Sequence, residues 1–303
     1  MRILITGSCG LIGSALGVSL QEIGIEIVPF DRRLQDGVGI PLDTRSADQL
    51  VKAASHCDGI IHLAAVSRVA WGERDPDLCA SVNVGGTKTL YQLASSIRPR
   101  PFVIFASSRE VYGHPEYIPV NEDAALRPCN IYGQTKADGE NLTRELAESG
   151  TQTAIVRFSN VYGSVDDHAD RVVPCFAREA ATNGSVRVDG PQCVFDFTHI
   201  EDVTRGMVQL VEMMMSGERP PPIHFVSGIG TSLGQLAELG RHLSGGKLSI
   251  VENQARNFDV SRFIGDGTRA DTILGWHPRT SLEAGFSRLV QAFKEHRPRD
   301  SHV

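Results

Sequence analysis

The stretch Ile3-Leu4-Ile5-Thr6-Gly7-Ser8-Cys9-Gly10-Leu11-Ile12-Gly13 decides the fold of this 303-residue chain. An apolar, β-branched run is typical of a buried parallel strand, and a segment with helical periodicity follows the glycines. The same alternation continues, with strands predicted at 2–6, 26–30, 59–64, 101–106 and 153–158, and helices at 11–23, 46–55, 75–97 and 132–148. It predicts an α/β fold: a Rossmann-type doubly wound parallel sheet.

The pattern changes after about Gly163. Helices are predicted at 171–182, 201–216, 232–244 and 282–296, joined by Gly- and Pro-rich segments, with a strand at 223–226. We therefore predict a first domain over 1–165, to which strands near 197–200 and 223–226 return. A smaller, helix-rich substrate domain is predicted over 166–303.

The bulk composition excludes several classes of protein. A net charge of −6 does not suit a nucleic-acid or membrane-surface binder, so neither partner is expected. The six cysteines have no CxxC spacing, and no metal site is predicted. No apolar run approaches the ~20 residues of a membrane span. Because a strand begins at once, we expect no signal peptide and a cytoplasmic protein with reduced thiols.

The three glycines have the spacing of a dinucleotide-binding turn. Gly7 permits the tight turn, Gly10 lets a pyrophosphate approach the backbone, and Gly13 allows close packing of helix and strand. Free N–H groups at the helix start are donors for phosphate. Asp31 ends the second strand, where its carboxylate can accept hydrogen bonds from both ribose hydroxyls and would repel a 2′-phosphate.

This arrangement favours NAD over NADP, although Arg32 and Arg33, directly after Asp31, could offset the negative charge. Asp43 follows a third apolar stretch. It either meets the adenine or is a solvated turn residue.

Tyr132 and Lys136 lie four residues apart at the start of a predicted helix, so they share one face. A phenol with a pKa near ~10 is a poor base at neutral pH, and a neighbouring cation lowers that pKa. Ser108 follows the strand at 101–106, and so lies at the carboxyl edge of the sheet with Tyr132. Alone, the Tyr-Lys pair could be a surface feature; together, these residues predict a device that moves a proton on or off a hydroxyl.

The order and spacing of several motifs resemble the extended short-chain dehydrogenase/reductase family, specifically its NAD-dependent nucleotide-sugar epimerases and dehydratases. The resemblance covers nearly the whole chain. Its motifs are Gly7/Gly10/Gly13, His62-Leu63-Ala64-Ala65, Asn83-Val84-Gly85-Gly86-Thr87, Ser107-Ser108-Arg109-Glu110-Val111-Tyr112-Gly113, Tyr132…Lys136, Arg157-Phe158-Ser159-Asn160-Val161-Tyr162-Gly163, Asp196-Phe197-Thr198-His199-Ile200-Glu201-Asp202-Val203 and Leu274-Gly275-Trp276.

The resemblance implies a role for individual residues. Ser108 would hydrogen-bond the reacting sugar hydroxyl, Tyr132 would be the base, and Lys136 would bind the nicotinamide ribose and lower the tyrosine pKa. Asn160 would contact the nucleotide-sugar phosphates, and Arg256 would clamp the diphosphate. The implied NAD-binding residues are Gly7, Gly10, Leu11, Ile12, Gly13, Asp31, Asp43, Leu63, Ala64, Ala65, Asn83, Tyr132 and Lys136. A homodimer formed through the helices at 75–97 and 132–148 is also implied.

The implied activity is epimerisation of a nucleotide sugar, at C4 through a 4-keto intermediate. A hydride taken from one face of the sugar would be returned to the other. Two enzymatic alternatives stay open, a 4,6-dehydratase and a UDP-uronate decarboxylase, in which Glu110 would act near C5. A reductase that releases its cofactor is a third. From another class, an NAD-binding redox sensor would keep the fold without turnover.

Three positions depart from the family pattern. Glu110, two residues after Ser108, either acts near sugar C5 or is merely packed or paired beside the site. Arg109 replaces the aspartate that serves as an acid in the dehydratases, and a guanidinium cannot donate that proton. Because arginine holds carboxylates well, we hypothesise a UDP-uronate substrate such as UDP-glucuronic acid; a structural salt bridge is the alternative. Phe195 stands where many relatives carry an arginine, so one phosphate contact is missing unless Arg187 or another residue supplies it. His62 and His199 are expected to be structural.

Overall fold

The computed structural model describes residues 1–37, 39, 41–256 and 260–295. Its centre is a six-stranded, wholly parallel sheet with the order β2-β1-β3-β4-β5-β9. The strands are β1 (Arg2–Thr6), β2 (Glu26–Phe30), β3 (Gly59–His62), β4 (Phe102–Ser108), β5 (Thr153–Phe158) and β9 (Ile223–Phe225). The predicted doubly wound sheet is confirmed.

The strand order places the candidate site residues at one edge. The chain runs outward from β1 to β2, then returns to add β3 on the other side of β1, so the order reverses between β1 and β3. In such sheets ligands bind beyond the carboxyl ends of the strands at this reversal. Gly7 follows β1, Leu63 follows β3, and Ser108 ends β4.

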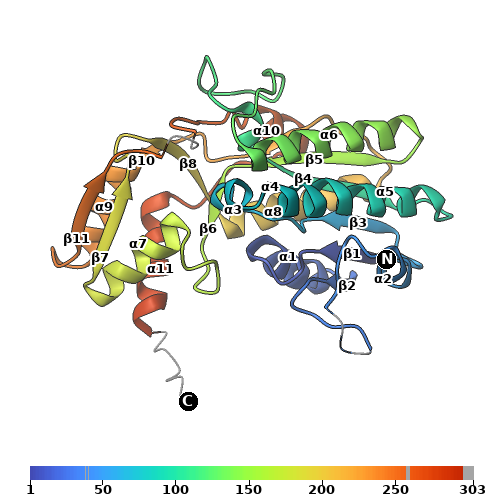
Figure 1. The fold of residues 1–303 in the computed structure, drawn as a ribbon, viewed down its shortest axis with the longest axis horizontal. Coiled ribbons are helices and arrows are strands. Elements are labelled where there is room, and N and C mark those ends of the chain that lie inside the picture. The colour runs from blue at the N-terminus through green and yellow to red at the C-terminus, as the bar shows by residue number, and fades with distance from the viewer. Residues whose placement is uncertain (38, 40, 257–259, 296–303) are drawn as a thin grey trace.

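Helices cover both faces of the sheet (Figure 1). On one face α1 (Leu11–Glu22) packs against α8 (Ile200–Met215) over a core that includes Ile3, Val156 and Trp276. On the other face lie α2 (Ala47–Ala54), α5 (Gly86–Ser96) and α6 (Ile131–Glu148). The connection from β3 to α5 contains α3 (Val69–Arg74), α4 (Pro76–Ala80) and the π-helical segment η1 (Ser81–Gly85). A 3₁₀ turn, η2 (Arg109–Tyr112), follows β4.

A second group of elements lies beside the carboxyl edge of the sheet, at the left in Figure 1. It contains α7 (Val172–Thr182), α9 (Leu233–Leu243) and α11 (Leu282–Glu295), packed on β7 (Ser185–Asp189) and β11 (Ser249–Asn253). A three-stranded sheet of β10 (Gly230–Ser232), β8 (Val194–His199) and β6 (Asn160–Tyr162) lies between this group and the large sheet. The short helix α10 (Thr268–Leu274) packs near β9.

Three predicted features differ from the structure. The strand near 197–200 does not return to the large sheet, because β8 pairs with β6 and β10 instead. The helix predicted over 75–97 is divided into α4, η1 and α5. Beyond residue 166 the chain alternates between the two groups, because α8 packs against the large sheet and β9 pairs with β5. The return of β9 to the large sheet was predicted. The division into domains at residue 165 stays a prediction.

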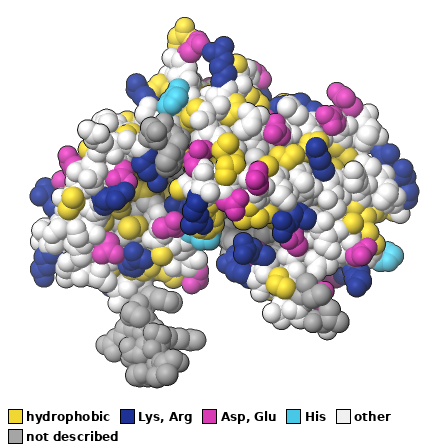
Figure 2. Space-filling view, viewed as in Figure 1, with side chains coloured by type: hydrophobic (Ala, Val, Ile, Leu, Met, Phe, Trp, Pro, Cys, Tyr) yellow, Lys and Arg dark blue, Asp and Glu magenta, His cyan; other side chains and the backbone are white. Residues whose placement is uncertain are grey.

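The surface carries no dominant charge on the face that Figure 2 shows, where acidic and basic side chains are interspersed. No helix within the described ranges is long and apolar enough to cross a membrane.

Candidate active site

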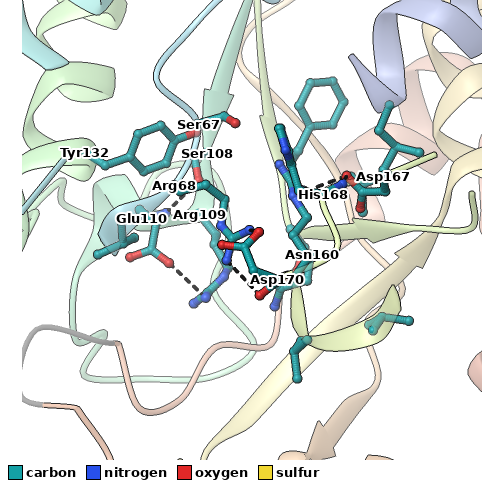
Figure 3. A pocket seen from close by; sticks show the side chains of 18 of the residues that line it. Ser67, Arg68, Ser108, Arg109, Glu110, Tyr132, Asn160, Asp167, His168 and Asp170 are labelled. Carbon is teal, nitrogen blue, oxygen red and sulfur yellow. Dashed lines mark hydrogen bonds and ion pairs between the residues drawn. The ribbon is translucent and has the colours of Figure 1, made fainter. Parts of the chain in front are cut away.

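A cavity of about 430 Å³ lies where the carboxyl edge of the large sheet meets the second group of elements. Gly7, Leu63, Ser108 and Tyr132 line its first side, and Asn160 lines the opposite one. Figure 3 shows Tyr132 and Ser108 facing this space, with Asn160, Asp167 and His168 across it. The fold thus brings together residues that are far apart in the sequence.

The glycine turn fits a dinucleotide. A side chain at Gly13 would place its Cβ 2.3 Å from the Gly7 carbonyl oxygen, and one at Gly7 would lie 2.8 Å from the Ala64 nitrogen. Gly7 also has a φ of +72°, which other residues rarely adopt. Gly10, the N-cap of α1, provides no side chain that caps the helix, so the first N–H groups of α1 are available to a phosphate.

The two aspartates predicted near the adenosine have different environments. Asp31 is buried; one carboxylate oxygen accepts from the Cys9 N–H at 3.0 Å, and the other from Arg33. A carboxylate has further lone pairs, so Asp31 can still accept from a ribose. Asp43 is half-exposed and paired with Arg45, which holds the pKa of Asp43 below its ordinary value. Neither aspartate lines the cavity, and their contacts to NAD stay predictions.

The π-helical segment η1 buries Asn83 beneath the cofactor side of the site. The Asn83 side chain accepts from the Val66 N–H at 2.7 Å, donates to the Val66 carbonyl at 3.2 Å, and donates to Thr135 at 2.9 Å. It therefore joins the loop after β3 to the helix that carries Tyr132. Asn83 does not line the cavity, so the structure gives it a supporting place rather than an exposed one.

Ser108 and Tyr132 come together because their elements end at the same edge. Ser108 is the N-cap of η2, and its hydroxyl accepts from the Glu110 N–H at 3.2 Å. Tyr132 is the second residue of α6, whose start is fixed by Asn130 accepting from the Gly133 N–H at 2.7 Å. A hydrogen bond from Ser108 acts on the Tyr132 phenol.

The electrostatics of Tyr132 differ from the sequence-based prediction. Burial raises the pKa of Tyr132 to about 12, and outweighs the opposite effects of the Ser108 hydrogen bond and the charge of Arg171. Burial also lowers the pKa of Lys136 to about 8, and the Lys136 ammonium donates to the Ala106 carbonyl at 2.8 Å. The pKa of Tyr132 in the protein alone is therefore raised and not lowered, because desolvation dominates, and a lowering contribution from Lys136 stays a prediction.

Arg109 and Glu110 are both buried and bind each other. Arg109 Nη2 lies 2.8 Å from one Glu110 carboxylate oxygen, and Asn130 donates to the other at 2.8 Å. Arg109 stacks on the Phe195 ring, 4.6 Å from its centroid. Arg109 Nη1 has no hydrogen-bond partner within the described part of the chain. Both residues line the cavity.

The predicted phosphate-binding residues also belong to this cavity. Asn160, Arg187 and Arg256 all line it. Arg187 pairs with Asp189 at 2.8 Å. Phe195 supports the guanidinium of Arg109, so a positive charge stands beside this position although residue 195 is not an arginine. The neighbours of Arg256 at 257–259 lie outside the described residues.

Sequence reasoning missed a polar loop, residues 163–171, on the far wall. Asp167 is buried, lines the cavity and lies 3.4 Å from Arg171. Asp170 binds Arg68, with 2.5 Å between Arg68 Nη1 and the carboxylate, which joins this loop to the loop after β3 (Figure 3). A pattern search does not find such residues because a loop has no periodicity.

The two histidines have structural contacts. His62 is bonded to Thr6 and Thr87 at 2.7 and 2.9 Å, and burial lowers its pKa to about 3. His199 is the N-cap of α8 and accepts from the Glu201 N–H. No group of histidine, cysteine, aspartate and glutamate side chains among the described residues could hold a metal ion.

Comparison with known proteins gives a consistent result. Residues 3–228 match the NAD dependent epimerase/dehydratase family. A UDP-glucose 4-epimerase of Mycolicibacterium smegmatis is 29% identical, over 97% of this chain and 99% of the relative. A UDP-glucose 4-epimerase of Thermotoga maritima, solved with UDP-glucose, is 26% identical, covers 97% of this chain and 99% of its own, and has a TM-score of 0.88.

MoeE5 is also 26% identical, with 97% and 99% of the two chains covered. It has been solved with UDP-glucose and NAD, and with UDP-glucuronic acid and NAD, at TM-scores of 0.89 and 0.87. These findings confirm the resemblance to the extended short-chain dehydrogenases/reductases. The chain belongs to the NAD-dependent epimerase/dehydratase family, and NAD is its cofactor.

Proposed function

We propose that this protein is a UDP-sugar 4-epimerase whose substrate is a UDP-uronate. The observation that carries the proposal is the common cavity of Ser108, Tyr132, Lys136 and Arg109, beside the glycine turn. The relatives named as UDP-glucose 4-epimerases support the reaction, and the UDP-glucuronic acid complex of MoeE5 supports the class of sugar.

The protein's own residues would handle the proton. Bound NAD supplies a hydride acceptor, later the hydride donor, and a positive ring charge. Tyr132 takes the proton of the C4 hydroxyl as the C4–H hydride leaves, and Ser108 holds the same oxygen by a hydrogen bond. Lys136 and Arg171 add positive charge that favours the phenolate. Tyr132 then returns its proton when the 4-ketone is reduced on its other face.

The contacts of Glu110 favour epimerisation over elimination or decarboxylation. A base at C5 must turn a carboxylate oxygen toward the substrate. Both oxygens of Glu110 already have partners, one in Arg109 and the other in Asn130. Glu110 therefore serves best as a support for Arg109 and for the start of α6. Without a C5 base, the ketone has reduction as its main outcome.

The proposed preference for a uronate depends on Arg109, which would bind the sugar carboxylate. Nη2 of Arg109 binds Glu110, while Nη1 has no hydrogen-bond partner among the residues that the structure describes. A substrate carboxylate would complete the hydrogen bonding of this buried guanidinium, and such a charge-assisted bond is strong. The alternative ligand is the diphosphate, because Arg109 lies against Phe195, where many relatives have an arginine.

The test compares UDP, UDP-glucose and UDP-glucuronic acid with the natural protein and Arg109→Ala. We expect UDP-glucuronic acid to be converted to an epimer of equal mass, identified by proton NMR. Arg109→Ala should raise KM for UDP-glucuronic acid ~10–100-fold, as for a lost bond to a charged group, and change UDP binding little. Arg127→Ala, which removes an arginine 70% exposed in its side chain, is the matched control.

The outcomes separate the claims. An equal loss of UDP affinity in Arg109→Ala would assign Arg109 to the diphosphate and overturn the uronate. Conversion of none of the UDP-sugars would overturn the epimerase.

A further inference from the structure

An ion pair on the cavity wall opposite Tyr132 has unused hydrogen-bonding capacity. Asp167 Oδ1 accepts from the His168 N–H at 2.8 Å and lies 3.4 Å from Arg171 Nε. Asp167 Oδ2 and Arg171 Nε have no hydrogen-bond partner among the residues that the structure describes. The Asp167 side chain is only 2% exposed. Figure 3 places Asp167 across the pocket from Tyr132 and Ser108.

Such an acceptor is unfavourable unless a ligand uses it. A buried carboxylate oxygen without a donor loses the hydrogen bonds it had with water. Burial accordingly raises the pKa of Asp167, although Arg171 lies beside it. Rotation about the terminal torsion of an aspartate is broad, so Oδ2 can turn toward the cavity that the residue lines.

The pair matches one chemical group. A carboxylate oxygen only accepts, and the guanidinium Nε–H only donates, whereas a hydroxyl does both. A sugar hydroxyl, or two neighbouring ones, would therefore satisfy both atoms. A phosphate or a substrate carboxylate would meet the negative charge of Asp167, so these groups are disfavoured here.

We propose that Asp167 and Arg171 form a hydroxyl-binding subsite for the pyranose ring, on the wall opposite Ser108 and Tyr132. The inference rests on the proposed function, since it assumes a nucleotide sugar in the cavity. Arg109 would bind an anionic substituent of the pyranose ring. Asp167 would bind hydroxyls at a different edge of the same ring. This fixes which ring carbon faces Tyr132 while the hydride leaves, and the 4-keto ring must turn over before the hydride returns to its other face.

The loop that carries the subsite is anchored directly after Asp167. Asp170 accepts from Arg68 Nη1 at 2.5 Å, and the Asp170 carbonyl accepts from Arg68 Nη2 at 3.0 Å. Arg171 is the N-cap residue of α7. The subsite is therefore held in place before a sugar arrives, which reduces the entropy lost on binding.

The test is calorimetric binding of UDP and of UDP-sugar to the NAD-loaded protein, with Asp167→Asn and Asp166→Asn. Asp167→Asn keeps the shape but removes the charge, so the affinity for UDP-sugar should fall about tenfold or more. The affinity for UDP should not change, because UDP has no pyranose. Asp166→Asn is the matched control, since Asp166 is the preceding residue, is exposed and does not line the cavity.

Deoxy sugars provide the second arm. UDP-sugars that lack the hydroxyl at C2 or at C3 are compared in both proteins. The natural protein should bind one of them about tenfold more weakly, and Asp167→Asn should add no further loss for that sugar. Equal losses of UDP and UDP-sugar affinity in Asp167→Asn, or an additive loss with every deoxy sugar, would overturn the subsite. Failure of the natural protein to bind any UDP-sugar more tightly than UDP would instead count against the proposed function.

Discussion

Tyr132 lies in a site where burial acts more strongly than charge. Burial raises its pKa to about 12 in the protein alone, so the phenol must first lose its own proton to solvent before it can act as a base, and the positive charge of bound NAD and of nearby cations would favour that loss. Lys136, with a pKa of about 8, is the complementary case of a cation that burial disfavours. Burial thus disfavours the charged form of both residues in the folded protein, as is common at active sites.

Removal of the phenol tests its role directly. Tyr132→Phe keeps the ring and its packing but removes the proton carrier, so kcat should fall ~10²–10⁴-fold, the usual contribution of general acid–base catalysis. NAD should still bind. Tyr117→Phe, at a tyrosine 83% exposed, is the control and should keep full activity. A kcat in Tyr132→Phe close to that of the natural protein would refute the role.

The buried lysine should reduce stability below pH 10. The folded pKa of Lys136 is about 8 and the ordinary value is 10.5, so between these values the unfolded chain binds a proton that the folded chain does not. Stability then rises with pH across this window, by about 3 kcal/mol from this group. Lys136→Met should be inactive, more stable than the natural protein at pH 7, and lose this advantage toward pH 10.5. Denaturant unfolding at several pH values measures the stability difference between Lys136→Met and the natural protein. A difference that does not change with pH would contradict the account.

Individual residues were predictable where a motif is local. The glycine turn and the Ser108, Tyr132 and Lys136 positions follow from short spacings, and all of these residues line one cavity. The direction of the Tyr132 pKa was not predictable, because desolvation depends on which distant segments cover the ring. Asp167 was missed for a similar reason, since an unused acceptor is visible only once its surroundings are known.

The junction between β1 and α1 should be sensitive to a single methyl group. Gly13→Ala would place a carbon 2.3 Å from the Gly7 carbonyl oxygen, so the helix start must shift, at a cost of roughly 1–3 kcal/mol. The increase in melting temperature that NAD causes should also be smaller in Gly13→Ala than in the natural protein. Gly17→Ala, in the same helix with open space around it, should leave NAD binding intact and raise stability by ~0.5–1 kcal/mol. Equal NAD responses in both variants would contradict the assignment of the turn.

Asn130 joins the start of α6 to Glu110. Asn130→Ala removes the helix cap, which costs about 1 kcal/mol of stability, and releases Glu110. Asn130→Ser restores a cap but leaves Glu110 without its donor. We expect only Asn130→Ala to lower the denaturation midpoint clearly, while both variants reduce kcat. Full kcat in Asn130→Ser would show that the link to Glu110 is unimportant.

At the level of elements, long periodic segments were predictable and short ones were not. The helix at 132–148 and the strand at 2–6 match α6 and β1 closely. The strands β6 and β10 have three residues each, too few for a period to appear. The π-helical segment η1 has no known sequence signal; the Asn83 contacts to the loop after β3 and to Thr135 accompany it.

Across the whole molecule, a buried polar network holds the site against the sheet. Arg157 on β5 donates to both carboxylate oxygens of Glu140 on α6 from Nε and Nη2, and its Nη1 donates to the Tyr112 hydroxyl. Tyr112 in turn bonds His224 on β9 at 2.6 Å, and Glu140 accepts from Ser107 at 2.6 Å. The end of β4 and the helix that carries Tyr132 and Lys136 are therefore fixed together. A fully paired network of this kind favours one arrangement over others.

The most direct test of the central claim is the reaction of UDP-glucuronic acid in D₂O, read by proton NMR and mass. If hydride is removed from C4 and returned to C4, the C4 epimer should form with no deuterium on any ring carbon. A deuterium at C5, or a product that has lost water or carbon dioxide, would show that C5 chemistry takes place. Either result would contradict the proposed epimerisation through Ser108, Tyr132 and bound NAD.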